Sequence, residues 1–353
     1  MSQTALIVGA SGIVGSAITQ LLIDNTWQVA ALSRHPSPSQ GVIPIAADLQ
    51  DPAALEHALA DLQPTHVFIT TWSRQATEAE NIRVNAAMVR NVLAAIRPAK
   101  SVEHVALVTG LKHYLGPFED YGKGRLAQTP FREEQGRLNV ENFYYAQEDE
   151  LFAAAEKDGF TWSVHRPHTV TGVAVGNAMN MATTLAVYAS ICKHTHRPFV
   201  FPGSSVQWDS LTDMTDARQL AKQQLWAATT PAAANQAFNV TNGDVFRWKW
   251  MWSRIAEYFD VPAADYPAAL SPLETQMAQD QAAWTQIVAE HGLKEADIDR
   301  LISPWHTDAD LGRPIEVVTD MSKSRAMGFT AYQASDQAFF DVFDKLRAMR
   351  LIP

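Results

Sequence analysis

The chain has 353 residues, a formal net charge of −10 and a single cysteine, Cys192. This length predicts two domains, and the acidic balance disfavours nucleic acid as the main partner. One cysteine excludes an intrachain disulfide and favours a reducing compartment. Because no signal-like segment and no apolar run of about 18 residues is found, we expect a cytoplasmic protein with no membrane partner.

The first motif is a glycine-rich turn between a strand-like run at 5–8 and helically spaced apolar residues at 18–22. Such a turn binds the pyrophosphate of a dinucleotide, with glycines for a tight turn, close backbone approach and helix packing. The alternative is a turn that only packs a helix on a sheet. The residues that we predict to bind a cofactor here are Gly9, Ser11, Gly12, Ile13, Val14 and Gly15.

The end of the next predicted strand, 27–33, indicates which cofactor is bound. An NAD-binding unit places a carboxylate there, but this chain has Ser33 and Arg34. A hydroxyl and a guanidinium suit a 2′-phosphate, so we predict NADPH; the alternative for Arg34 is an ordinary surface arginine. Asp48, followed by Leu49, is expected at the adenine edge, or else as a cap of the helix that follows.

Strands and helices then alternate, which predicts an α/β fold with a doubly wound, mostly parallel Rossmann sheet. We assign residues 1–175 to an NADPH-binding Rossmann domain, with return segments near 205–245. Residues 176–353 are assigned mostly to a smaller, mainly helical substrate domain and lid. The further elements predicted in the Rossmann part are strands at 43–46, 67–71, 105–109, 160–164 and 237–240, a long helix at 78–96, and a return to the sheet at 207–216.

Ligands of such sheets bind beyond the carboxyl ends of the strands. Residues at three strand ends are therefore further cofactor candidates, and those around 165–172 are expected to lie against the nicotinamide. They are Thr70, Thr71, Trp72, Thr109, Gly110, Arg166, Pro167, Thr169 and Val170.

Two patterns suggest other functions only weakly. Cys192, His194 and His196 alternate, but three close ligands without a fourth do not predict a metal site, so none is assigned. Tryptophans interleaved with basic residues at 247–252 resemble a nucleic-acid stacking surface. Because the chain is acidic, a helix with one face in the core and one face in solvent is the better interpretation of residues 247–252. Within 261–310 we expect surface helices, with Trp284 and Trp305 in a core or lid.

Several stretches together resemble a known family. Beside the glycine turn they are Thr109–Phe118, Asn142–Tyr145, Arg166–Pro167, Val187–His194, Phe238–Lys249 and Met321–Ser324. They are similar to the progesterone 5β-reductase/iridoid synthase-like (PRISE) enzymes, which are extended short-chain dehydrogenases/reductases. The resemblance covers nearly the whole chain and is weakest between about 262 and 318.

The resemblance implies NADPH-dependent reduction of the C=C bond of a small apolar enone or enal. By motif position it implies Tyr144 and Lys112 as catalytic residues and Phe118 as a wall of the substrate pocket. Tyr145 is also assigned to the pocket, although neighbours on a helix point about 100° apart and one tyrosine should be core. A homodimer is expected from the family alone.

The residues themselves favour this chemistry over alcohol oxidation. Most short-chain dehydrogenases carry a lysine four residues after the tyrosine, but Tyr144 and Tyr145 are followed there by Glu148 and Asp149. A carboxylate would oppose a tyrosinate base. Enone reduction needs only a donor to the enolate oxygen, which a neutral tyrosine provides. A nucleotide-sugar epimerase or dehydratase, and a non-catalytic NADPH-binding sensor, remain as alternatives.

Overall fold

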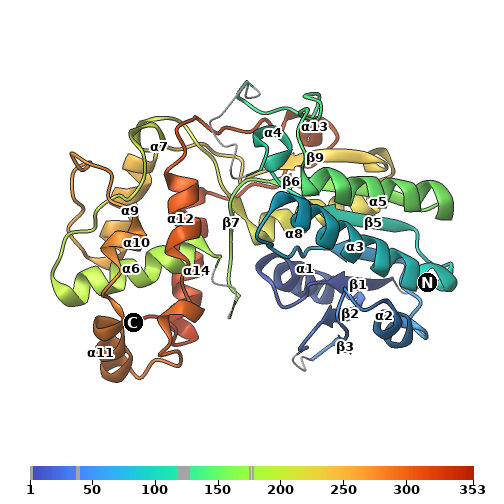
Figure 1. Cartoon of the computed structure of the whole chain (residues 1–353), viewed down its shortest axis with the longest axis horizontal. Helices are drawn as coiled ribbons and strands as arrows, with labels where there is room; N and C mark the ends of the chain where they lie inside the picture. Colours follow the sequence, from blue (N-terminus) through green and yellow to red (C-terminus); the bar gives the residue numbers. More distant parts are fainter. Residues whose placement is uncertain (1–2, 37–39, 118–127, 175, 177–178) are drawn as a thin grey trace.

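Seven parallel strands form the central sheet of the half that lies on the right in Figure 1. The computed structural model describes residues 3–36, 40–117, 128–174, 176 and 179–353. The strand order is β3-β2-β1-β4-β5-β6-β9, which confirms the doubly wound α/β prediction. The strands are β1 (Thr4–Val8), β2 (Gln28–Ser33), β3 (Val42–Ala46), β4 (His66–Ile69), β5 (His104–Val108), β6 (Thr161–Pro167) and β9 (Gln236–Val240).

Helices cover both faces of this sheet because successive side chains of each strand point to opposite faces. In β1, Leu6 and Val8 pack into one apolar core, whereas Ala5 and Ile7 pack into the other. The first core is closed by α2 (Pro52–Leu59), α3 (Glu78–Ile96) and α5 (Phe143–Asp158). The second is closed by α1 (Ile13–Asp24) and α8 (Ala217–Thr229).

The other half is mainly helical and has a core of its own, as predicted. Trp248, Trp252 and Trp284 are fully buried there, so the tryptophans at 248 and 252 are core residues. No helix among the described residues is long and apolar enough to span a bilayer. The helices of this half are α6 (Met181–Thr195), α7 (Ser205–Asp209), α9 (Trp248–Phe259), α10 (Leu273–Gln276), α11 (Gln281–His291), α12 (Pro304–Leu311) and α14 (Ser335–Ala348).

One predicted element is wrong. Residues 207–216 do not return to the central sheet, because the segment starts inside α7 and ends in the two-residue strand β8 (Thr215–Asp216). This strand pairs with β7 (Val170–Thr171) in a separate small sheet. The chain rejoins the large sheet only at β9. The division of the chain at residue 175 stays a prediction.

Candidate active site

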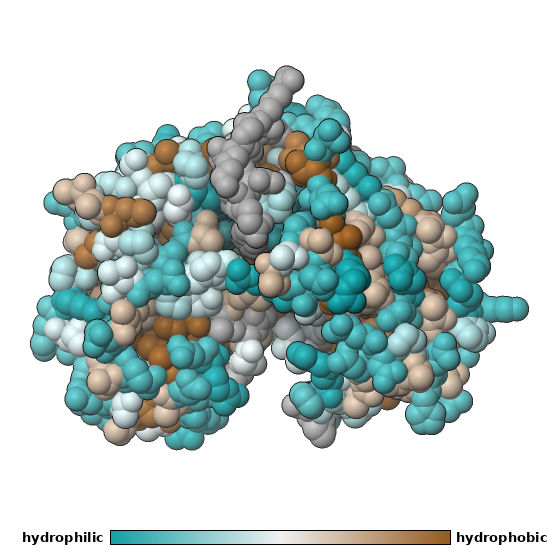
Figure 2. Space-filling model, viewed as in Figure 1, coloured by the Kyte–Doolittle hydropathy of each residue, from teal (hydrophilic) through white to brown (hydrophobic). Residues whose placement is uncertain are grey.

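A cavity of about 630 Å³ lies at the carboxyl ends of the central strands and is walled by both halves of the molecule. The strands end level with one another, since Val8 pairs with Ile69 and Ile69 with Leu107. In Figure 2 the two lobes are separated by a notch at the lower edge of the view. The predicted residues on the wall are Gly9, Ser11, Gly12, Ile13, Val14, Thr70, Thr71, Trp72, Thr109, Gly110, Lys112, Tyr144, Pro167, Thr169 and Val170.

The glycine turn has the geometry that dinucleotide binding requires. Gly9 has a φ of +91°, in the region that favours glycine, and its N–H donates to Leu32 O at 3.0 Å. A Cβ at Gly15 would lie 2.1 Å from Gly9 O, so this glycine lets α1 pack on the turn. Gly15 therefore lies behind the cavity wall. A Cβ at Gly12 would meet only Gly9 O at 3.4 Å, so the protein itself leaves room there.

The start of α1 also fits a phosphate group. Gly12 is the N-cap and supplies no side-chain oxygen to the first N–H groups of the helix. Those groups carry the positive end of the helix dipole and border the cavity at Ile13 and Val14. The turn therefore suits the pyrophosphate of a dinucleotide.

Lys112 opens the short helix α4 (Lys112–Leu115), directly beyond β5. The residue is only 6% exposed, so Lys112 is a buried lysine. Its Nζ lies 4.8 Å from the ring centre of Phe143, 5.2 Å from that of Trp72 and 6.0 Å from that of Tyr144. The ammonium is thus held among aromatic faces, whose quadrupoles favour a cation.

Tyr144 lies in the first turn of α5 and faces the same cavity. Its hydroxyl is beside Gly110, where a Cβ would lie 3.2 Å away. Burial, together with the carboxylates of Glu78 and Asp310, raises the pKa of Tyr144. The phenol therefore stays protonated at neutral pH and is a hydrogen-bond donor rather than a base.

Asn142 joins these two residues. Its Oδ1 accepts a hydrogen bond from Tyr144 N at 3.0 Å and caps α5. Its Nδ2 donates to Lys112 O at 2.7 Å. A single buried amide therefore sets the distance between the start of α5 and the start of α4.

Arg166, which was predicted to bind a cofactor, lies off the cavity wall. Successive residues of a strand point to opposite faces, so Pro167 reaches the cavity and Arg166 points away from it. The buried guanidinium is 3.3 Å from Glu148 Oε1, and it donates to the Tyr114 hydroxyl at 3.3 Å. Arg137 pairs with the other oxygen of Glu148 at 2.9 Å. The carboxylate four residues after Tyr144 is thereby neutralised by two arginines.

Tyr145 is a core residue rather than part of the cavity wall. Its hydroxyl donates to His113 O at 2.6 Å and accepts from Leu138 N at 2.9 Å. It points away from Tyr144, as the helical spacing of neighbours requires. Phe118 lies outside the described residues.

Four further cofactor candidates lie at the same sheet edge but not on the cavity wall. Ser33 ends β2, and Arg34 is exposed beyond it. Asp48 is also exposed, and its Oδ1 accepts from Gln50 N at 2.9 Å, while Asp51 caps α2. Leu49 packs partly against the α2–α3 side of the sheet.

The sequence analysis missed the polar wall that α12 supplies. His306 and Asp310 are four residues apart, so they share the helix face that borders the cavity, and Arg313 follows. Asp310 accepts from the Thr169 hydroxyl at 2.6 Å. Arg313 donates to Asp310 O at 2.8 Å and is 2.9 Å from His168 Nε2. Only the spacing of His306 and Asp310 could have indicated this wall.

Comparison with known proteins identifies the family. The family model described as "PRISE-like Rossmann-fold domain" matches residues 46–353. The chain is 40% identical to an (S)-8-oxocitronellyl enol synthase of Nepeta cataria, over 99% of this chain and 93% of the relative. It is 38% identical to the 3-oxo-Delta(4,5)-steroid 5-beta-reductase of Arabidopsis thaliana, over 99% and 93%. The chain belongs to the PRISE family.

Solved structures show how widely the PRISE fold is shared. The Bordetella bronchiseptica enzyme WbmG, in complex with NAD and UDP, superposes with a TM-score of 0.68 at 16% identity, covering 100% of this chain and 97% of that one. At this identity the likeness concerns the fold alone. Among the residues that the structure describes, no group of three or more metal-ligating side chains occurs.

The glycine turn of this PRISE protein yields a matched test. We expect Gly12→Ala to leave the melting temperature nearly unchanged but to weaken NADPH binding by about tenfold or more, because the new methyl enters the phosphate site. Gly15→Ala should lower the free energy of unfolding by about 1–3 kcal/mol, because its methyl meets backbone. Calorimetry and NADPH fluorescence measure the two effects. If Gly12→Ala bound NADPH as tightly as the wild type does, the assigned phosphate site would be contradicted.

Proposed function

We propose that the protein is an NADPH-dependent oxidoreductase that reduces the C=C bond of α,β-unsaturated aldehydes or ketones. When bound, NADPH would supply the hydride that the β-carbon of the enone receives. Negative charge then develops on the carbonyl oxygen, and the enolate takes a proton at the α-carbon from water. The PRISE relatives named above include a steroid 5-beta-reductase, which supports a reductase of this type.

The observation that carries the proposal is the position of Tyr144 on the wall of the cavity that the glycine turn also borders, where burial raises the pKa of its hydroxyl. A donor aimed at a developing oxyanion in a buried site stabilises the transition state strongly. A base for alcohol oxidation would need a lowered pKa, and the surroundings of Tyr144 do the opposite. The same argument disfavours the epimerase alternative.

Lys112 also supports the proposal that the cavity stabilises an enolate. Its ammonium borders the cavity beside Tyr144 and adds positive charge where the enolate forms. The cavity also has apolar walls, supplied by Leu111, Leu115 and Met179. An enone with an apolar body fits such a space, since binding sites are mostly apolar with a few polar groups.

The preference for NADPH rests on the end of β2. Ser33 and the exposed Arg34 stand where an NAD-selecting carboxylate would lie. A guanidinium binds a phosphate through paired, charge-assisted hydrogen bonds. The 2′-phosphate of NADPH therefore has a partner in this chain.

Replacement of Tyr144 tests the proposed reaction. Tyr144→Phe should lower kcat for 2-cyclohexen-1-one by about a hundredfold, because one lost oxyanion donor costs about 3 kcal/mol. The dissociation constant of NADPH should change by less than about twofold. Turnover is followed by loss of NADPH absorbance, with the saturated ketone identified by mass.

Tyr188→Phe is the matched control, because it removes a buried hydroxyl that bonds Gln276 Oε1 and Val200 O and does not line the cavity. It should keep wild-type turnover. Unchanged turnover in Tyr144→Phe would refute the assigned role. Tight NADPH binding without turnover of any enone by the wild type would instead favour a non-catalytic sensor.

Replacement of Arg34 tests the nucleotide preference. Arg34→Ala should raise the KM for NADPH about tenfold or more and leave that for NADH nearly unchanged, since only NADPH carries the 2′-phosphate. Arg83→Ala is the control, because Arg83 is an exposed arginine that pairs with Glu80 and with no other carboxylate among the described residues. Equal effects on both nucleotides would contradict the assignment.

A further inference from the structure

A second cavity of about 270 Å³ adjoins the main one at Trp72 and Lys112, which line both. We call it the side chamber. Its remaining walls are polar apart from one alanine, whereas the main cavity has both polar and apolar walls. They are formed by Arg74, Gln75, Ala76, Glu78 and Asn81. A substrate held at Lys112 therefore has a polar space next to it.

The side-chain oxygens of Glu78 and Asn81 in the side chamber are already used by the protein. Glu78 Oε1 accepts from Phe143 N at 2.7 Å, and its Oε2 accepts from Asn81 Nδ2 at 3.0 Å. Asn81 Oδ1 accepts from Gln75 N at 2.8 Å. These bonds hold the start of α3 against α5. They leave little capacity on Glu78 and Asn81 to bind a donor from a ligand.

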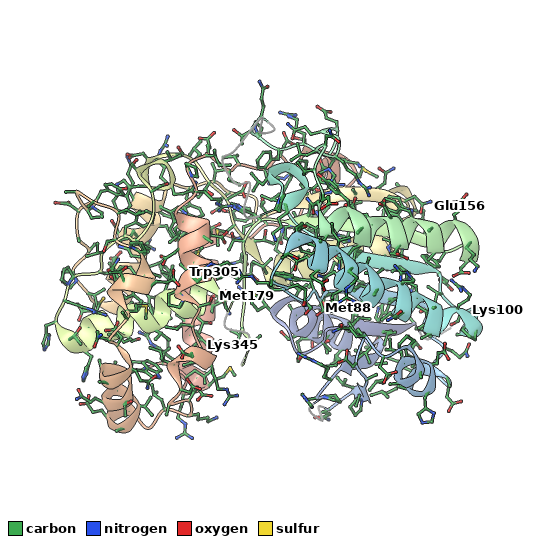
Figure 3. All side chains as sticks on the ribbon, viewed as in Figure 1. Met88, Lys100, Glu156, Met179, Trp305 and Lys345 are labelled. Carbon is green, nitrogen blue, oxygen red and sulfur yellow. The ribbon has the colours of Figure 1, made fainter. Side chains whose placement is uncertain are left out.

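Arg74 is oriented by a ring from the other half of the molecule. Its guanidinium carbon lies 3.5 Å from the ring centre of Trp305 in α12. Figure 3 shows Trp305 between the two halves, where α12 faces the Rossmann half. A guanidinium stacked on an indole keeps the N–H groups at its edge available. Two of these N–H groups can donate to the two oxygens of one carboxylate. Among the described residues, no carboxylate pairs with Arg74 within 4.0 Å.

Two cations line the side chamber, Arg74 and Lys112, against one carboxylate, Glu78, whose oxygens already accept from Phe143 N and Asn81 Nδ2. Burial lowers the pKa of His306, and although Asp310 opposes this effect, Arg313, Arg74 and Lys112 lower the pKa further. Three cations therefore act on one point of the wall that α12 supplies. Asp310 is itself engaged by Thr169. An anionic group is the ligand that this field favours.

We propose that the side chamber binds a carboxylate of the substrate through Arg74. The preferred substrates are then enals or enones whose far end carries a carboxylate, while the unsaturated carbonyl lies at Tyr144 and Lys112. This inference rests on the proposed function and specifies its substrate class. Trp305 is the positioning residue that holds the guanidinium in place.

Matched acids and esters test the side chamber. We would compare a series of ω-carboxylated 2-enals of increasing chain length with their methyl esters. The wild type should show kcat/KM for the best acid about tenfold or more above that for its ester, because only the acid forms charge-assisted hydrogen bonds. Arg74→Gln should abolish this preference and leave the ester and the KM for NADPH unchanged. Arg83→Gln, on the neighbouring α3, should behave as the wild type.

Two results would overturn the inference. One is an ester reduced as well as its acid by the wild type. The other is an equal loss for acid and ester in Arg74→Gln, which would show that Arg74 acts only by packing on Trp305. Calorimetric binding of hexanoate and of its methyl ester to the NADP⁺-loaded protein separates the two proposals. If Arg74→Gln binds hexanoate more weakly than the wild type does, the anion site is supported even when no enal is reduced. Equal binding of hexanoate by the two proteins would exclude the anion site.

Discussion

The hydrogen bonds of Asn142 are the interaction on which the candidate active site depends. This buried amide accepts from Tyr144 N and donates to Lys112 O. It therefore ties the turn beyond β5 to the first turn of α5, two segments that are 30 residues apart in the chain. A second bond, from the Tyr145 hydroxyl to His113 O, fastens the same two segments. The backbone of the site is thus fixed independently of any ligand.

Electrostatics then determine what these residues can do. A short-chain dehydrogenase that oxidises alcohols needs a tyrosinate, whereas here burial and two carboxylates hold the phenol protonated. The charge of Glu148, which could have disturbed the site, is instead paired with Arg166 and Arg137. The ammonium of Lys112 and the phenol of Tyr144 are left to face the cavity together. This combination suits the stabilisation of an enolate.

Most of the Rossmann half could be predicted from the sequence, because its strands and helices follow local periodicity and its ligand-binding turn has a local glycine pattern. The helix at 78–96 and the glycine turn are examples. The direction of the Arg166 side chain could not be predicted, because a register shift of one residue moves every side chain of a strand to the opposite face of the sheet. Residues 207–216 were assigned wrongly for a similar reason, since two-residue strands have too little pattern to identify a partner.

The wall from α12 was hidden for a different reason. His306 and Asp310 come close to Lys112 only through the packing of two halves, and no motif links them in the sequence. Even so, their spacing on one helix face was visible. The side chamber could be predicted even less, because Arg74 and the ring of Trp305 that contacts it are separated by most of the chain.

The proposed reaction delivers hydride to the β-carbon of an enone. It is tested most directly with NADPH deuterated at the transferable position and a simple enal or enone. The position of the label in the product is then read by nuclear magnetic resonance. Our account predicts a saturated carbonyl product with deuterium at the β-carbon and none on the carbonyl carbon. Deuterium on the carbonyl carbon of an allylic alcohol would contradict it, because the enzyme would then be a carbonyl reductase.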